Sequence, residues 1–220
     1  MANTTMGITE DLHTYVVNVG VREPDVLQRL RAETSALDNH EMQIAPEQGA
    51  LLAMLTELTG ARRCLEVGTF TGYSSTAVGL AMPSDGTMVC CDVSTEWTDV
   101  ARRYWAEAGL ADRVDLRIGP GVETLDTLLA GGEGATYDFA FVDADKSSYG
   151  AYYDRVLELT RPGGLIVFDN TLRGGEVLDP DPADEGTRAV KALNERLHDD
   201  ERVSSAMLPI ADGVTLVRKR

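Results

Sequence analysis

The sequence predicts an α/β protein built on a doubly wound, mostly parallel sheet of seven strands, with extra helices before the sheet. Short apolar runs alternate with helical patterns at intervals that suit right-handed crossovers between parallel strands. The last two strand-like runs, 202–208 and 214–217, are separated by a turn at 211–213 that is so short that it can join only antiparallel neighbours. The last strand is therefore expected to run against the others.

Residues 9–59 have the pattern of helices that precede the sheet. Pro24 suits a first helical turn, and leucines recur at helical spacing after Pro46. This region could serve as a lid or as a dimer surface. A loop rich in Gly, Asp and Pro at 173–186 leads into a last helix that ends near His198. Further strands are expected at 63–67, 87–92, 113–118, 137–142 and 165–169, and the helices between them should begin at Tyr73, Thr95, Gly121 and Tyr149.

Composition limits the classes of protein to which this fold could belong. The 220 residues, 43% hydrophobic and without a long biased tract, fit one domain over residues 1–220. The formal net charge of −16 disfavours a nucleic-acid partner, because phosphates require a basic surface. The three cysteines lie in strand-like runs without metal-ligand spacing, which fits a reduced cytoplasm. With no signal-peptide pattern and no membrane-spanning run, we expect a soluble, cytoplasmic protein without a membrane partner.

A glycine-containing turn between the first strand and its helix indicates a nucleotide-like ligand. The segment 66–74 has two glycines, Gly68 and Gly72, that permit a tight turn and the close approach of a ligand. It lacks the Gly-x-Gly-x-x-Gly of dinucleotide binders, and Glu66 would repel a pyrophosphate but attract an ammonium group. Asp92 ends the second strand, where an acid can accept both hydroxyls of a ribose. S-adenosylmethionine satisfies both acids; the alternative is a plain strand-to-helix turn with a capping acid.

Acid and amide side chains also follow two later strands. Asp143 and Asp145 come directly after one apolar run, and Asp169 and Asn170 come after the next. In an open α/β sheet ligands bind at the carboxyl ends of the strands, so these oxygens can converge on one hard cation. The alternative is turn and cap chemistry, which is common for Asp and Asn. These two strand ends are the most informative candidates for the chemistry of the protein.

These motifs resemble those of class I S-adenosylmethionine-dependent methyltransferases, which have a Rossmann-like fold. More narrowly, the chain is similar to the metal-dependent O-methyltransferases of the caffeoyl-CoA and catechol type (family 3), and its short N-terminal region resembles bacterial members. The likeness runs from about Met42 to the C-terminus and rests on ordered blocks at 42–44, 66–74, 92, 119–120, 141–146, 162–164, 169–170, 208–210 and 212–213.

The resemblance implies a set of site residues. Gly121 stands where relatives usually have alanine, and since that position makes mainly a backbone contact we expect little change. The implied ligands of a divalent metal, Mg²⁺ or another such as Mn²⁺ or Ca²⁺, are Asp143, Asp169 and Asn170. The implied cofactor contacts are Ile44, Glu66, Gly68, Thr69, Ser74, Asp92, Gly121 and Asp145.

The chemistry of methyl transfer explains why such a site would need a metal. A phenol must attack the sulfonium methyl group as something near a phenolate, which water at neutral pH does not supply. Mg²⁺ held by both oxygens of a catechol would acidify the attacking hydroxyl and aim it. The resemblance assigns a catalytic role to Asp143 and makes Lys146 the general base. The alternative is an exposed lysine at a helix start.

The chain departs from its relatives beside the implied metal ligands. Arg173 stands where the family usually has a tryptophan that walls the aromatic substrate, so a stacking face is lost and a donor fork is gained. We hypothesise that Arg173 contacts an acidic or unusually shaped hydroxylated substrate; the alternative is that it points into solvent. Gly174 replaces a CoA-contacting asparagine of the plant enzymes, and the acidic surface would repel a CoA tail. A CoA thioester is therefore disfavoured.

Three functions are compatible with a fold of this class. The first is a metal-dependent O-methyltransferase that acts on a vicinal dihydroxy aromatic small molecule, as a homodimer, because dimers are usual in the family. The second, a nicotinamide-dependent oxidoreductase, is disfavoured by the missing dinucleotide motif. The third, a non-catalytic S-adenosylmethionine-binding protein, would leave the metal ligands and Lys146 without a purpose. The histidines His13, His40 and His198 are scattered and are expected on surface helices.

Overall fold

The computed structural model describes residues 7–220, which are organised around one seven-stranded sheet. The strand order is β3-β2-β1-β4-β5-β7-β6, and β7 is antiparallel to both of its neighbours, whereas β1 to β5 pair in parallel. The predicted sheet, with its reversed last strand, is confirmed. The strands are β1 (Arg63–Val67), β2 (Thr87–Asp92), β3 (Val114–Ile118), β4 (Tyr137–Val142), β5 (Thr160–Phe168), β6 (Val203–Leu208) and β7 (Val214–Lys219).

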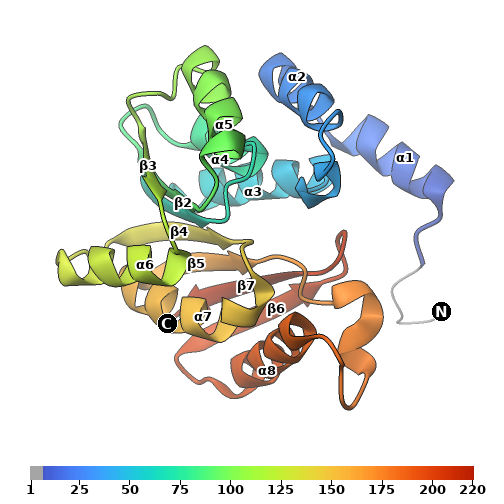
Figure 1. Ribbon diagram of the computed structural model, residues 1–220, viewed down its shortest axis with the longest axis vertical. Helices are drawn as coiled ribbons and strands as arrows, with labels where there is room; N and C mark the ends of the chain where they lie inside the picture. The colour runs from blue at the N-terminus through green and yellow to red at the C-terminus, as the bar shows by residue number, and fades with distance from the viewer. Residues whose placement is uncertain (1–6) are drawn as a thin grey trace.

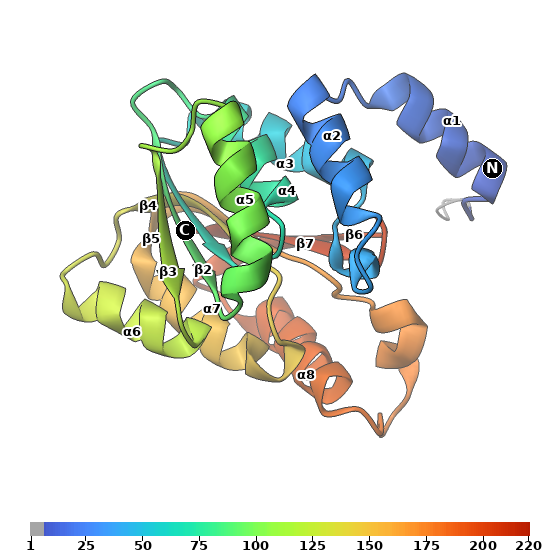
Figure 2. The ribbon, with the colours of Figure 1, turned by 45° about the horizontal axis from the view of Figure 1, so that its top comes forward.

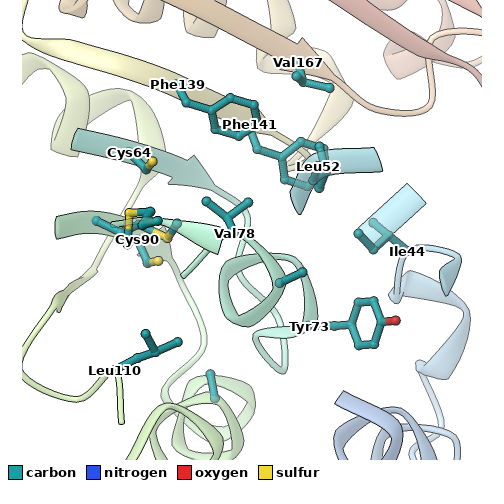
Figure 3. Packing of buried hydrophobic residues seen from close by; sticks show 14 of the residues in the cluster. Ile44, Leu52, Cys64, Tyr73, Val78, Cys90, Leu110, Phe139, Phe141 and Val167 are labelled. Carbon is teal, nitrogen blue, oxygen red and sulfur yellow. The ribbon is translucent and has the colours of Figure 1, made fainter. Parts of the chain in front are cut away.

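Side chains of the central strands alternate between two apolar layers, as the two-residue period of a strand requires. Phe139 and Phe141 of β4 belong to one layer, together with Cys64 of β1 (Figure 3), whereas Ala140 and Val142 belong to the other. Both faces of the sheet are therefore buried. This explains why β4 and the last four residues of β5, 165–168, are almost continuous apolar runs in the sequence.

Helices cover both faces of the sheet (Figure 1). The first layer contains α3 (Pro46–Thr59), α4 (Tyr73–Ala81) and α5 (Thr95–Glu107), and the second contains α6 (Gly121–Ala130), α7 (Tyr149–Leu159) and α8 (Glu185–Asp199). The helices α4 to α7 begin at the four predicted residues. Because a crossover helix runs back toward the start of the next parallel strand, its N-terminus lies at the carboxyl edge of the sheet.

The N-terminal helices differ in how they are attached. α2 (Asp25–Thr34) buries Leu27 and Leu30 in the first layer, and the Thr34 hydroxyl donates to Thr71 in the β1–α4 turn at 2.9 Å. α1 (Glu10–Gly20) buries no side chain and lies at the margin of the molecule (Figure 2). α2 and α3 are therefore part of the core, and the role of residues 1–60 as a lid or dimer surface stays a prediction.

Two regions differ from the expected boundaries. β5 begins at Thr160 instead of 165, because Thr160 pairs with Tyr137 before an irregularity in the register, and the ladder continues from Leu165. The loop at 173–186 contains a 3₁₀ helix, η3 (Arg173–Leu178), interrupted by two left-handed glycines. Shorter 3₁₀ helices form η1 (His40–Met42) and η2 (Lys146–Ser148). Within residues 7–220, none of the helices is both long enough and apolar enough to cross a bilayer.

Candidate active site

A cavity of about 860 Å³ opens at the carboxyl edge of the sheet, where β1, β2, β4 and β5 end. It brings the turn after β1 together with the two acid-bearing strand ends. One predicted site residue, Glu66, does not line it and is buried in β1, two residues before Gly68. The other predicted site residues all line it: Ile44, Gly68, Thr69, Ser74, Asp92, Gly121, Asp143, Asp145, Lys146, Asp169, Asn170 and Arg173.

The β1–α4 turn comes so close to its neighbours that glycine is required in it. Gly68 has a φ of 91°, and a Cβ at this position would lie 2.2 Å from the carbonyl oxygen of Asp143. Gly72 has a φ of 86°, and a Cβ there would lie 2.6 Å from the Cβ of Ala101. Larger residues would push the turn away from the end of β4. Gly68 therefore sets this turn directly against the acid edge, and Gly72 sets it against α5.

Asp92 shapes the same turn from the end of β2. Its Oδ2 accepts hydrogen bonds from the backbone N–H groups of Thr69 at 2.9 Å and Phe70 at 2.8 Å, and its Oδ1 accepts one from Ser94 at 2.8 Å. The alternative of a structural, cap-like acid is thus partly correct. Each carboxylate oxygen can accept more than one hydrogen bond, so this arrangement leaves Asp92 able to receive ligand hydroxyls from the cavity.

Glu66 is a buried acid without a partner. Its side chain belongs to β1 and the residue is 1% exposed, yet neither carboxylate oxygen accepts a hydrogen bond. Burial raises the pKa of Glu66 to about 8, because the nearby hydroxyls of Ser74 and Thr69 offset only part of the desolvation. A positively charged ligand group would supply the interaction that the protein itself does not provide.

Two further acids, Asp143 and Asp169, follow β4 and β5; Asp169 is buried and the Asp143 side chain is 14% exposed. Asp143 Oδ1 accepts a hydrogen bond from the Lys146 ammonium at 2.7 Å, and Asp169 Oδ1 accepts one from the backbone N–H of Asn170 at 2.7 Å. Burial raises the pKa of Asp143, and Lys146 opposes that rise. Burial and the charge of Asp143 raise the pKa of Asp169 to about 7. The two acids therefore lie close enough to repel each other.

This pair and the adjacent amide have the chemistry of a hard-cation site. Within the part of the chain that the structure describes, no three His, Cys, Asp or Glu side chains gather as metal ligands, so the amide of Asn170 would have to be the third protein ligand. Asn170 has a φ of 50°, a left-handed conformation that Asn adopts more readily than most residues. Carboxylate and amide oxygens suit Mg²⁺ or Ca²⁺, and a cation would relieve the repulsion between the two acids. The donor set fits.

Lys146 is fixed beside these acids. Its side chain is 15% exposed, its Nζ donates to Asp143, and the ammonium lies 5.0 Å from the centre of the Tyr149 ring. The alternative of an exposed lysine at a helix start is therefore wrong. Its Nζ is therefore occupied by Asp143, and it can turn to a substrate only when another cation replaces it at that carboxylate.

Arg173 lines the cavity but is held only loosely. Its Nε lies 3.4 Å from the Thr187 hydroxyl and its Nη2 lies 3.5 Å from Asp184 Oδ2, both near the start of α8. The side chain is 28% exposed. It neither extends freely into solvent nor forms a tight ion pair. An anionic group in the cavity could therefore recruit it at little cost.

Several cavity residues were missed by sequence reasoning. Tyr152 of α7 is buried and its hydroxyl donates to Asp145, and Phe70 and Trp97 pack edge to face with ring centres 5.2 Å apart. Gln48 of α3 also lines the cavity and is 1% exposed. No sequence motif marks these residues. The only local signal is that Trp97 comes five residues after Asp92 and Tyr152 six residues after Lys146. By contrast His13, His40 and His198 lie on surface helices, as expected.

Asp145 and Gly121 differ in detail from expectation. Asp145 precedes η2, but its side chain makes no capping hydrogen bond and is bound by the Tyr152 hydroxyl instead. A Cβ at Gly121 would lie 2.9 Å from the Tyr152 hydroxyl and 3.0 Å from Val67 Cγ1. The lack of a side chain at Gly121 therefore gives Tyr152 room, which the sequence did not indicate.

The comparison with protein families identifies the chain. The model of the O-methyltransferase family matches residues 17–220. This chain belongs to the O-methyltransferase family. Tricin synthase 2 of Oryza sativa subsp. japonica is 44% identical over an alignment that covers 96% of this chain and 75% of the rice protein. Caffeoyl-CoA O-methyltransferase 2 of Zea mays is 40% identical, with 96% of this chain and 83% of the maize protein covered.

A solved structure agrees with these relatives. The O-methyltransferase TomG from Streptomyces achromogenes, crystallised in complex with SAM, superposes with a TM-score of 0.86 at 33% identity, covering 95% of this chain and 96% of TomG. The predicted family, the Rossmann-like fold and the enzyme class of O-methyltransferase are confirmed. The nicotinamide-dependent oxidoreductase is set aside.

The unpartnered acid Glu66 generates a stability prediction. A carboxyl whose pKa is raised on folding destabilises the folded state as pH increases from the unfolded value, near 4.5, toward about 8. Glu66→Gln is therefore expected to stabilise the ligand-free protein by about 1–3 kcal/mol at pH 7. The gain should be larger at pH 8 than at pH 5.5, as measured by urea denaturation.

Glu57→Gln is the matched control, because Glu57 is an exposed glutamate of α3. Its effect should stay within about 0.5 kcal/mol at both pH values. A Glu66→Gln variant that is no more stable than the wild type at pH 8 would show that Glu66 already has a satisfactory partner.

Proposed function

We propose that this O-methyltransferase takes its methyl group from S-adenosylmethionine and, with a divalent cation at Asp143, Asp169 and Asn170, transfers it to one hydroxyl of a vicinal dihydroxy aromatic small molecule. The observation that carries the proposal is the single cavity in which the β1–α4 turn adjoins the two acid-bearing strand ends. A methyl donor in the turn and an oxygen substrate at the acids would be neighbours.

The cavity offers complementary groups for the methyl donor. Glu66 lacks the positive partner that an α-ammonium group would supply, and Asp92 faces the cavity from the end of β2 at the level expected for a ribose. Asp145, which accepts a hydrogen bond from the Tyr152 hydroxyl, would also accept one from the exocyclic amine of the adenine of S-adenosylmethionine. TomG, which is similar in fold, was crystallised with SAM. The proposed cofactor contacts are Ile44, Glu66, Gly68, Thr69, Ser74, Asp92, Gly121 and Asp145.

The residues at the strand ends would bind and orient the substrate. A divalent cation bound there acts as a Lewis acid that lowers the pKa of a hydroxyl group. Asp143 and Asp169 supply the negative charge that binds such a cation, and Asn170 supplies a neutral oxygen. Lys146, whose Nζ lies 2.7 Å from Asp143, would as a neutral amine receive the hydroxyl proton and so become the ammonium that pairs with Asp143.

An assay tests the function directly. The purified protein is incubated with S-adenosylmethionine, Mg²⁺ and a panel of catechols, with and without EDTA, and the products are examined by mass spectrometry. We expect a mass gain of one methyl group that disappears in EDTA and returns with excess Mg²⁺. Turnover that persists in EDTA would contradict the metal mechanism, and binding of S-adenosylmethionine without transfer to any catechol would contradict the substrate class.

Arg173 is proposed to select substrates with an acidic group. Because its guanidinium is held only by contacts of 3.4 and 3.5 Å, it can turn to a carboxylate in the cavity. Arg173→Ala is expected to raise KM for a carboxylated catechol by about 5- to 30-fold and to leave KM for neutral catechol within about twofold. Steady-state kinetics measure both.

The control for Arg173 is Arg102→Ala, which removes an exposed arginine from α5 and should change neither KM. Equal KM values for the wild type and Arg173→Ala with both substrates would show that Arg173 does not select the substrate.

The homodimer and the cytoplasmic location that the sequence implied stay predictions. The exposed apolar side chains of α1, Tyr15 and Val19, together with Ile8 just before it, support a contact through this helix.

A further inference from the structure

We propose that Glu23, in the linker between α1 and α2, is a positioning residue for the methyl-donor end of the cavity and acts through Tyr73. This inference rests on the S-adenosylmethionine site of the proposed function. Glu23 does not line the large cavity, whereas Tyr73 does. Neither residue is among the cofactor contacts that the resemblance implies. The effect of Glu23 on the donor would be exerted through the ring of Tyr73.

Tyr73 stands between the turn after β1 and the N-terminal region. It is the first residue of α4, follows Gly72 directly and precedes Ser74, which is a proposed cofactor contact. Tyr73 lines the large cavity and also a second cavity of about 260 Å³ between the α1–α2 linker, α3 and α4. It is therefore part of the wall that separates the donor site from this second cavity.

The far end of the Tyr73 ring is held by a buried ion pair. In Figure 3 the ring points away from the strands, with its oxygen outermost. This hydroxyl donates a hydrogen bond to Glu23 Oε1 at 2.6 Å. Arg31 donates to both oxygens of the same carboxylate, from Nε at 2.9 Å and from Nη2 at 2.7 Å. The Glu23 side chain is only 8% exposed, and a desolvated, charged acceptor binds a hydroxyl strongly.

The packing around the ring leaves room behind it. Gly49 of α3 lies against the ring, since a Cβ there would be 2.7 Å from Tyr73 Cε1. Small side chains, among them Ala50, Ala53 and Ala77, line part of the second cavity. Without its bond to the linker, the ring could turn into this space and open the wall of the donor site. The hydrogen bond is therefore what fixes the ring.

A second contact ties the same N-terminal region to the donor turn. Thr34, the last residue of α2, donates from its hydroxyl to that of Thr71 at 2.9 Å, and both residues are fully buried. Thr71 and Tyr73 both line the large cavity. Glu23 lies two residues before α2 begins, so the two contacts hold the turn from the two ends of this helix.

A network of the same composition supplies a matched control. Tyr104 of α5 donates to Glu33 Oε2 at 2.8 Å, and Arg103 donates to the same carboxylate. Tyr104 is buried in the same core cluster as Tyr73, but it does not line the large cavity. Each tyrosine thus makes one hydrogen bond to a glutamate of the N-terminal region, and only Tyr73 borders the donor site.

The test is affinity for S-adenosylhomocysteine, measured by calorimetry, together with the midpoint of unfolding in urea. Tyr73→Phe and Glu23→Ala are each expected to raise Kd by about 5- to 30-fold, as the loss of a hydrogen bond to a charged group would. The double variant should stay within about twofold of the weaker single variant, because both changes break the same contact. Tyr104→Phe should lower the urea midpoint but leave Kd within about twofold.

If Glu23→Ala does not fold, as judged by circular dichroism, Glu23→Gln replaces it. This variant keeps an acceptor without the charge and should raise Kd by about threefold or more. Unchanged Kd in Tyr73→Phe, additive losses in the double variant, or an equal loss in Tyr104→Phe would overturn the role of Glu23 alone. A wild type that does not bind S-adenosylhomocysteine would overturn the proposed methyl-donor site and this inference with it.

Discussion

The burial of three acids at one edge of the sheet is the constraint on which the site depends. Glu66 and Asp169 are buried, the Asp143 side chain is 14% exposed, and of the three only Asp143 forms an ion pair, with Lys146. Burial raises the pKa of each acid, and this lowers the free energy of unfolding of the ligand-free protein near neutral pH. Ligands that bring positive charge, one to Glu66 and one to the other two acids, would relieve it.

The fold accounts for the position of each acid. Three parallel strands end at the same edge, which aligns their last residues, and Gly68 allows the turn after β1 to touch the backbone of Asp143. The helices on both faces keep water from the strands beneath. A methyl donor bound against Glu66 and a cation bound at Asp143 and Asp169 would therefore be brought together by the sheet itself, without a large movement of the chain.

Much of the fold could be predicted because it depends on local patterns. Strand-like runs such as 137–142 are apolar on both faces, and helices such as the one from Tyr73 follow directly on turn glycines, so their limits are visible in the sequence. The start of β5 could not be predicted, because Thr160 joins the sheet through an irregular pairing with Tyr137. Such a pairing depends on the neighbouring strand and not on the residues around Thr160.

The candidate site likewise has a part that the sequence predicts and a part that it does not. Acids such as Asp92 and Asp169 could be found because their positions at strand ends are set by the strands before them. The hydrogen bonds of Asp92 to the β1–α4 turn, the contact of Tyr152 with Asp145 and the placement of Gln48 arise from elements far apart in the sequence. The orientation of Arg173 toward Asp184 depends on where α8 begins and likewise has no local signal.

The most direct test of the central claim is to remove one of the paired acids and to measure turnover and cofactor affinity separately. We predict that Asp169→Ala abolishes methyl transfer, by about a thousandfold or more, while affinity for S-adenosylhomocysteine stays within about twofold, because Asp169 serves the cation and not the methyl donor. Asp154→Ala, at an exposed acid on α7, is the control and should change neither quantity. Equal loss of turnover and cofactor affinity in Asp169→Ala would contradict the assignment of this edge to a cation.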